Sequence, residues 1–200
     1  SILGPDFQHW CGPDSVVERF GGAAVHYPPG AFGQNNLEIA QHIIEQVRAH
    51  IPQGARVAEF YAGVGAIGLS VLDRVSELRM NELSPQSLLG LELGLAQLDA
   101  ADRTKVRVVT GAAGDARLAT TDMDVVIADP PRKGLDPELA ASLAERPPER
   151  LVYVSCGIDS FLSDTVRLTS QGKLRLGALT AFNLSPFTEH VETVARFDRV

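Results

Sequence analysis

The chain of 200 residues has 44% hydrophobic and 22% charged residues, a composition that indicates a globular domain and excludes a disordered one. No apolar run approaches the ~20 residues of a transmembrane helix, and Cys11 and Cys156 lack the paired spacing of a disulfide framework or a zinc site. The net charge of −7 argues against a free-standing nucleic-acid binder, which usually carries a basic surface.

The first thirty residues differ from the rest of the chain. The segment SVVERFGGAAVHYPPG predicts two short strands on either side of a Gly-Gly turn, followed by a Pro-Pro-Gly stop. Because so few residues do not fold alone, we expect residues 1–30 to be a flap, or the remnant of a preceding domain, on a main domain of residues 31–200. The first residues show no secretory signal, so we expect a cytoplasmic protein without a membrane segment.

From Asn36 onward, apolar residues recur at helical spacing as far as Val47, and strand-like and helix-like segments then alternate. The expected strands are Arg56–Tyr61, Leu78–Glu82, Val106–Thr110, Asp124–Ala128 and Leu151–Ser155. The expected helices after Val47 are Ala66–Leu72, Pro85–Leu98, Pro137–Ala144 and Ser160–Ser170. Such alternation predicts an α/β fold with a mostly parallel, twisted sheet and helices on both faces. Two strands without a helix between them, residues 174–182 and 191–197, predict an antiparallel C-terminal hairpin at the sheet edge.

In such a sheet, ligands bind at the carboxyl ends of the strands. After the first of these strands, Gly63, Gly65 and Gly68 have the spacing G-x-G-x-x-G, which allows a tight turn and close backbone approach to a ligand. Glu82, at the end of the next strand, can accept hydrogen bonds from ribose hydroxyls. A nicotinamide dinucleotide or S-adenosylmethionine would satisfy both features, and the glycines alone also fit a plain strand–helix turn.

The fourth strand of this series runs directly into Asp129-Pro130-Pro131-Arg132. Dinucleotide chemistry gives no reason for such a turn, whereas two prolines can fix a rigid wall against which a planar base is held. The turn is similar to the substrate-side motif of nucleic-acid methyltransferases that use S-adenosylmethionine. The alternative is a plain turn without a ligand.

The segment LVYVSCG ends the fifth strand with Cys156, which on the strand alone is either a small buried hydrophobe or a nucleophile. Two other short motifs accompany it and the Asp-Pro-Pro-Arg turn, namely AFGQNN, with Phe32, Gln34 and Asn36, and SPFTEHVE, with Pro186, Thr188, His190 and Glu192. Over roughly residues 15 to 200, these motifs in this order resemble the RNA uracil-5-methyltransferase family. The resemblance implies a Rossmann-like class I methyltransferase fold, S-adenosylmethionine as cofactor and a uridine of rRNA or tRNA as substrate.

The resemblance also implies roles for individual residues. Cys156 would be the catalytic nucleophile and Glu192 the proton acceptor. The residues implied at the cofactor are Gln34, Tyr61, Gly63, Gly65, Glu82 and Asp129, and those at the RNA base are Phe32, Pro130 and Arg132. His190 would be a structural hydrogen-bonding residue. Family members commonly carry further RNA-binding domains, so we expect one outside this chain.

The sequence departs from the family pattern at a few positions. Ala66 stands where Asn is frequent, Gly157 follows the nucleophile where Asn or Asp is common, and Ser185 and Phe187 replace the usual Phe and His around Pro186. None of these departures removes a catalytic group, but they leave the RNA substrate open.

The chemistry explains why one thiol and one base are needed. Addition of a thiolate to carbon 6 of uracil makes carbon 5 nucleophilic, and a base must later remove the carbon 5 proton so that the thiol can leave. A thiol near its reference pKa of ~8.5 is mostly protonated at neutral pH, so we expect a site that favours the thiolate. The sequence does not identify the residue that would do so.

Other functions remain open at this point. An amino-methyltransferase acting on adenine or guanine also fits the Asp-Pro-Pro turn but needs neither Cys156 nor Glu192. A cytosine-5 RNA methyltransferase usually has its cysteine just after the proline of that turn, where Pro131 and Arg132 stand here. A non-catalytic RNA-binding module would retain only the fold, and an NAD-linked oxidoreductase would explain only the glycines and Glu82.

Overall fold

The computed structural model describes residues 8, 10–184 and 191–200, with the backbone alone at residues 117–119. Within these residues, seven strands form one sheet in the order β5-β4-β3-β6-β7-β9-β8. The strands are β3 (Ala55–Phe60), β4 (Val75–Glu82), β5 (Val106–Thr110), β6 (Val125–Ala128), β7 (Arg150–Ser155), β8 (Leu174–Phe182) and β9 (Glu192–Arg199). The expected α/β fold is confirmed.

The strand pairing sets the position of the ligand-binding edge. β3 pairs in parallel with both β4 and β6, so the chain builds the sheet to one side of β3 and then returns to the other. Such a switch point leaves a crevice beyond the carboxyl ends of β3 and β6. β9 lies antiparallel between β7 and β8, which confirms the expected hairpin at the sheet edge.

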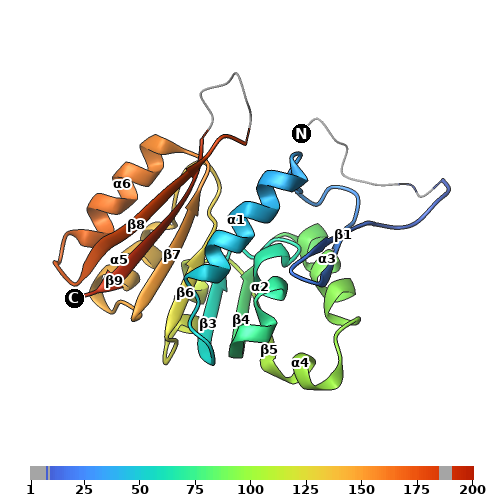
Figure 1. The fold of residues 1–200 in the computed structure, drawn as a ribbon, viewed down its shortest axis with the longest axis horizontal. Helices are drawn as coiled ribbons and strands as arrows, with labels where there is room; N and C mark the ends of the chain where they lie inside the picture. The colour runs from blue at the N-terminus through green and yellow to red at the C-terminus, as the bar shows by residue number, and fades with distance from the viewer. Residues whose placement is uncertain (1–7, 9, 185–190) are drawn as a thin grey trace.

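Helices cover both faces of the sheet (Figure 1). They are α1 (Leu37–Ala49), α2 (Ala66–Ser70), α3 (Pro85–Leu95), α4 (Ala100–Lys105), α5 (Pro137–Glu145) and α6 (Ile158–Thr169), with 3-10 turns η1 (Leu72–Arg74) and η2 (Asp115–Thr120). Successive residues of β6 point alternately to two hydrophobic clusters, one under α1, α2 and α3 and the other under α5 and α6. In the described part of the chain, no helix is long and apolar enough to cross a membrane.

The N-terminal hairpin forms a small sheet of its own from β1 (Val16–Phe20) and β2 (Ala23–Tyr27). It packs on α3, where a Cβ at Gly90 would collide with the carbonyl oxygen of His26. The absence of a side chain at that position therefore allows the strand backbone to touch the helix directly. Phe20 and Val25 of the hairpin are buried in the same cluster as α1.

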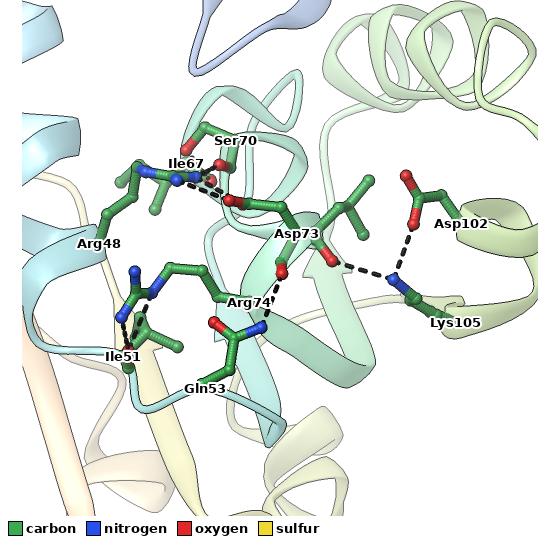
Figure 2. Close-up of polar contacts among 10 residues, drawn as sticks. Arg48, Ile51, Gln53, Ile67, Ser70, Asp73, Arg74, Asp102 and Lys105 are labelled. Carbon is green, nitrogen blue, oxygen red and sulfur yellow. Dashed lines mark hydrogen bonds and ion pairs between the residues drawn. The ribbon is translucent and has the colours of Figure 1, made fainter.

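A polar network, which Figure 2 shows, lies near the amino-terminal ends of the strands, away from the ligand-binding edge. Arg48 of α1 donates to the carbonyl oxygen of Ser70 and to both carboxylate oxygens of Asp73, and Arg74 donates twice to the carbonyl oxygen of Ile51 at 3.0 Å. These hydrogen bonds connect α1 and the loop after it to the segment between β3 and β4. They lie away from the carboxyl ends of the strands and stabilise the scaffold.

Candidate active site

Cys156 and Glu192 come together because of the register of two antiparallel strands. Ser155, the last residue of β7, pairs with Thr193 near the start of β9, and the hydroxyl of Thr193 donates to the carbonyl oxygen of Ser155 at 3.4 Å. The next residues outward on the two strands are Cys156 and Glu192, and both are half-buried. Residues far apart in the sequence therefore face each other at the end of the sheet.

A cavity of about 490 Å³ opens beside this pair. It is lined by Arg132, Cys156, Gly157, Ile158, Asp159, Ser160 and Val191. Arg132 reaches the cavity from the loop after β6, whereas the other side chains belong to the end of β7, the first turn of α6 and the approach to β9. The structure thus brings a thiol and a guanidinium to one opening that is large enough for a planar base.

The electrostatics of Cys156 differ from the expectation. Burial raises the pKa of the Cys156 thiol and the charges of Glu192 and Asp129 raise it further, whereas the charge of Arg132 and a backbone hydrogen bond act in the opposite direction and favour the thiolate. The site of the free protein therefore keeps the thiol protonated, and the expectation of a thiolate-favouring site is wrong for this state. Formation of the thiolate requires that a nearby group accept its proton.

Two carboxyl groups beside the thiol have raised proton affinities. Burial, followed by the charge of Glu192, raises the pKa of Asp129 to about 7. Burial also raises the pKa of Glu192, while Arg132 partly opposes this shift. A carboxylate with a raised pKa is a stronger base than an exposed one, so both groups are suited to accepting protons near neutral pH.

Glu59 is a buried acid that the sequence interpretation missed. It lies in β3, is 1% exposed, and accepts one hydrogen bond, from the amide of Gly68 at 3.2 Å, while its Oε2 has no partner among the described residues. Burial and then the negative charge of Asp129 raise the pKa of Glu59 to about 8. A single acid inside the apolar stretch RVAEF is the signal that could have identified it.

The raised pKa of Glu59 predicts a pH-dependent stability. Glu59 keeps its proton up to about pH 8 in the folded chain but loses it near pH 4.5 when unfolded. The free energy of unfolding is therefore highest, as far as Glu59 is concerned, below pH 4.5. It falls as the pH rises from there to about 8, by an amount on the order of a few kcal/mol. Glu59→Gln cannot ionise, so urea unfolding should show that wild type loses stability relative to this variant between pH 5 and pH 8. Parallel pH profiles for the two proteins would contradict this reading.

Glu82 and Gly63 meet at the other side of the switch point. One carboxylate oxygen of Glu82 accepts from the amide of Gly63 at 2.7 Å, and the other accepts from the amides of Leu83 and Ser84 at 2.8 and 2.7 Å. Since a carboxylate has about four acceptor positions, roughly one remains for a ligand. A Cβ at Gly63 would meet no atom within 4 Å, so the space above this residue is open.

The turn that carries Gly63, between β3 and α2, is strained and tightly packed. Tyr61 has a φ of 60°, a left-handed conformation that bulky side chains rarely adopt, and its hydroxyl accepts from the amide of Asp136 at 2.8 Å. Gly65 has a φ of 88°, and a Cβ there would press on Leu91 and Leu69. The packing of this turn gives Gly65 a structural requirement for glycine.

The remaining predicted site residues lie around this opening in different ways. Pro130 is buried in the loop after β6, whereas Phe32 is 75% exposed and Gln34 half-buried in the segment before α1. Neither Phe32 nor Gln34 is among the residues that line the cavity at Cys156. Pro186, Thr188 and His190 of the C-terminal motif, with Ser185 and Phe187, lie outside the described residues. Nowhere in the described ranges do three or more Cys, His, Asp or Glu side chains gather as metal ligands would.

Several known RNA methyltransferases are similar to this chain in sequence. The family model described as tRNA (uracil-5-)-methyltransferase matches residues 19–199. An uncharacterized RNA methyltransferase of Protochlamydia amoebophila is 36% identical over 94% of this chain and 49% of its own length. A tRNA (uracil(54)-C(5))-methyltransferase of Pyrococcus horikoshii is 30% identical over 92% of this chain and 43% of its own.

A solved structure shows the same architecture. The tRNA (uracil-54, C5)-methyltransferase of Pyrococcus abyssi, crystallised with S-adenosyl-L-homocysteine, superposes with a TM-score of 0.81 and 25% identity. The alignment covers 96% of this chain and 46% of the Pyrococcus protein. The chain spans about half the length of the curated relatives it matches.

Proposed function

Because the chain belongs to the tRNA (uracil-5-)-methyltransferase family, we propose that it transfers a methyl group from S-adenosylmethionine to carbon 5 of a uridine in RNA. The observation that carries this proposal is that Cys156 and Glu192 lie one residue beyond the paired Ser155 and Thr193 of β7 and β9, so that the charge of Glu192 acts on the thiol. Cys156 and Arg132 line a cavity there, and a nucleophile with a base beside it is what carbon 5 chemistry requires. An amino-methyltransferase has no use for this pair, and a cytosine-5 methyltransferase usually has its cysteine just after the proline of the turn, where Pro131 and Arg132 stand here.

The residues around the cavity suit the order of the steps. Asp129 accepts the Cys156 proton, so that Glu192 stays a carboxylate, and the sulfur then forms a bond to carbon 6 of the uracil. The added electron pair makes carbon 5 nucleophilic, and carbon 5 would take the methyl group, whose bond to the sulfonium sulfur would break to leave S-adenosylhomocysteine. Glu192 as carboxylate then takes the carbon 5 proton, the double bond re-forms, and the bond from sulfur to carbon 6 breaks to release Cys156.

The residues near Gly63 fit the cofactor of this family. S-adenosylmethionine supplies an electrophilic methyl group when it is bound. Glu82 retains an acceptor position for a ribose hydroxyl, and the open space above Gly63 admits a ligand close to the backbone. Asp129 directly follows β6, which lies in the sheet between β3, the strand before Gly63, and β7, the strand before Cys156. The base would then be held between Pro130, Arg132 and Phe32, with Gln34 and Tyr61 at the cofactor.

Substitution of Glu82 tests the cofactor region alone. In Glu82→Gln, the side-chain amide group must face at least one of the backbone amides that Glu82 now accepts from, so a donor meets a donor. Loss of charge-assisted bonds of ~1.5–3 kcal/mol should weaken S-adenosylhomocysteine binding about tenfold or more. Isothermal calorimetry measures this affinity, with Glu92→Gln, on α3, as a matched control. Tight binding of NAD by the wild-type protein, or unchanged affinity in Glu82→Gln, would contradict the assignment.

The proposed function is tested by the nucleosides of cellular RNA. Mass spectrometry of separated tRNA and rRNA, from cells with and without the gene, should show that 5-methyluridine is lost from one of the two classes. The gene, but not its Cys156→Ala variant, should restore the modification. Loss of a methylated adenine or guanine with unchanged 5-methyluridine would instead support an amino-methyltransferase.

A further inference from the structure

Asp164 is a buried carboxylate that the proposed chemistry does not use. It lies in α6, is 2% exposed, and its Oδ2 accepts two hydrogen bonds, from the amide of Leu135 and from the hydroxyl of Tyr153, both at 2.8 Å. Its Oδ1 lies 3.7 Å from a guanidinium nitrogen of Arg167, whose side chain is 55% exposed. Burial of a charge is costly unless hydrogen bonds compensate for it, so the position of this carboxylate needs a reason.

The two donors come from the segments that carry the candidate active site. Tyr153 lies in β7, three residues before Cys156, and its buried ring stacks on Phe161 of α6 with a centroid separation of 5.8 Å. Leu135 lies in the loop that begins with Asp129 and includes Arg132. A single carboxylate therefore joins this loop, the strand that ends at the nucleophile and the helix that follows it.

The loop is pressed closely against this carboxylate. Gly134 has a φ of 86°, and a Cβ at that position would collide with Oδ2 of Asp164. The neighbouring Arg132 and Lys133 are exposed, so the packing of their side chains does not hold the loop in place. The end of the loop is anchored by the Leu135 side chain, which is buried in a hydrophobic cluster, and by two backbone hydrogen bonds, from the Leu135 amide to Asp164 and from the Asp136 amide to the Tyr61 hydroxyl.

We propose that Asp164 is a positioning residue, which holds the loop of Asp129 and Arg132 against the end of β7 so that both face Cys156. The role rests on the proposed function, because it is defined by the reaction at that thiol. Misplacement of reacting groups by about 1 Å can lower a rate about a hundredfold, so a loop anchor some distance from the chemistry matters for turnover. Retention of a charged group, where a neutral one would be less costly to bury, agrees with a need for strong, directed bonds.

Two substitutions of Asp164 separate the effect of its charge from the effect of its hydrogen-bond acceptor. Asp164→Asn keeps one oxygen that can accept from both donors, whereas Asp164→Leu has the same branched arrangement of heavy atoms, with larger methyl groups and no acceptor. In Asp164→Leu, we expect the Leu135 amide to exchange with deuterium at least tenfold faster and kcat to fall about 10- to 100-fold. The affinity for S-adenosylhomocysteine should change less than about threefold. Asp164→Asn should restore most of both losses, and Arg167→Met, which removes only the outer ion pair, should resemble wild type.

Two measurements, the exchange rate of the Leu135 amide and kcat, together test the positioning role. Faster exchange at Leu135 with an unchanged kcat, or equal kcat losses in Asp164→Asn and Asp164→Leu, would overturn the positioning role. If Asp164→Leu does not fold, Gly134→Ala displaces the loop from the same carboxylate, and the same faster exchange and kcat loss are expected. Absence of methyl transfer by wild type would contradict the proposed function, while exchange at Leu135 would still decide whether Asp164 holds the loop.

Discussion

Cys156→Ala should lower methyl transfer to RNA by at least about 10⁴-fold, because the reaction cannot begin without the bond from sulfur to carbon 6. The substitution is small and Cys156 is half-buried, so the fold should persist and the loss should be one of chemistry. S-adenosylhomocysteine should bind the variant about as tightly as it binds wild type, since the cofactor region lies around Gly63 and Glu82. Transfer of a labelled methyl group to RNA, together with calorimetry, measures both quantities.

Cys11→Ser is the matched control for this experiment. Cys11 is exposed and far along the chain from the cavity, so its loss should leave activity near the wild-type level. Substantial methyl transfer by Cys156→Ala would return this residue to a role in packing alone. The same result would favour a reaction without covalent catalysis.

Glu192→Gln should fail at a later step than Cys156→Ala. The nucleophile remains, and Asp129 can still accept its proton, so addition to carbon 6 and methyl transfer should proceed. The amide cannot take the carbon 5 proton, so turnover should fall about 10²- to 10⁴-fold and the adduct between protein and RNA should accumulate. Denaturing electrophoresis should then show a retarded band that requires the cofactor.

The same variant also tests the electrostatics. Because the charge of Glu192 raises the pKa of Cys156, its removal should lower that pKa. Alkylation of the thiol by iodoacetamide should therefore begin at lower pH in Glu192→Gln than in wild type, with Cys11 replaced by Ser in both proteins. Glu145→Gln, at an exposed position of α5, should behave as wild type in both assays. Full turnover by Glu192→Gln, or an unshifted alkylation profile, would contradict the assigned role.

Much of the fold could be predicted because the buried strands are short apolar runs. The expected Val106–Thr110 and Leu174–Phe182 coincide with β5 and β8, and the other expected strands differ from the observed ones by up to three residues at their ends. Helix α4 was not expected, since none of its six residues is buried and no apolar period identifies it. The first turn of α6 was missed for a related reason, because Gly157 precedes it without a side-chain cap.

The candidate site was only partly predictable. The motifs identified the residues at the strand ends, but the approach of Cys156 to Glu192 depends on the register of β7 and β9, which the sequence does not specify. Asp164 lies three residues after Phe161 and four before Leu168, on the buried face of α6, so helical spacing could have indicated its burial, whereas only the tertiary structure shows which groups its carboxylate contacts. The raised pKa values of Asp129 and Glu192 also depend on the tertiary structure, because they arise from burial and from charges on separate segments of the chain.

The most direct test of the account uses RNA that contains 5-fluorouridine. The fluorine at carbon 5 cannot be removed as a proton can, so the reaction should stop after methyl transfer with sulfur still bound to carbon 6. Wild-type protein, this RNA and S-adenosylmethionine should give a band that survives denaturing electrophoresis, and mass spectrometry of the digested complex should place the nucleotide on Cys156. If uridine in the same RNA is converted to 5-methyluridine while the fluorinated RNA gives no adduct, or an adduct on Cys11, the covalent role of Cys156 is contradicted.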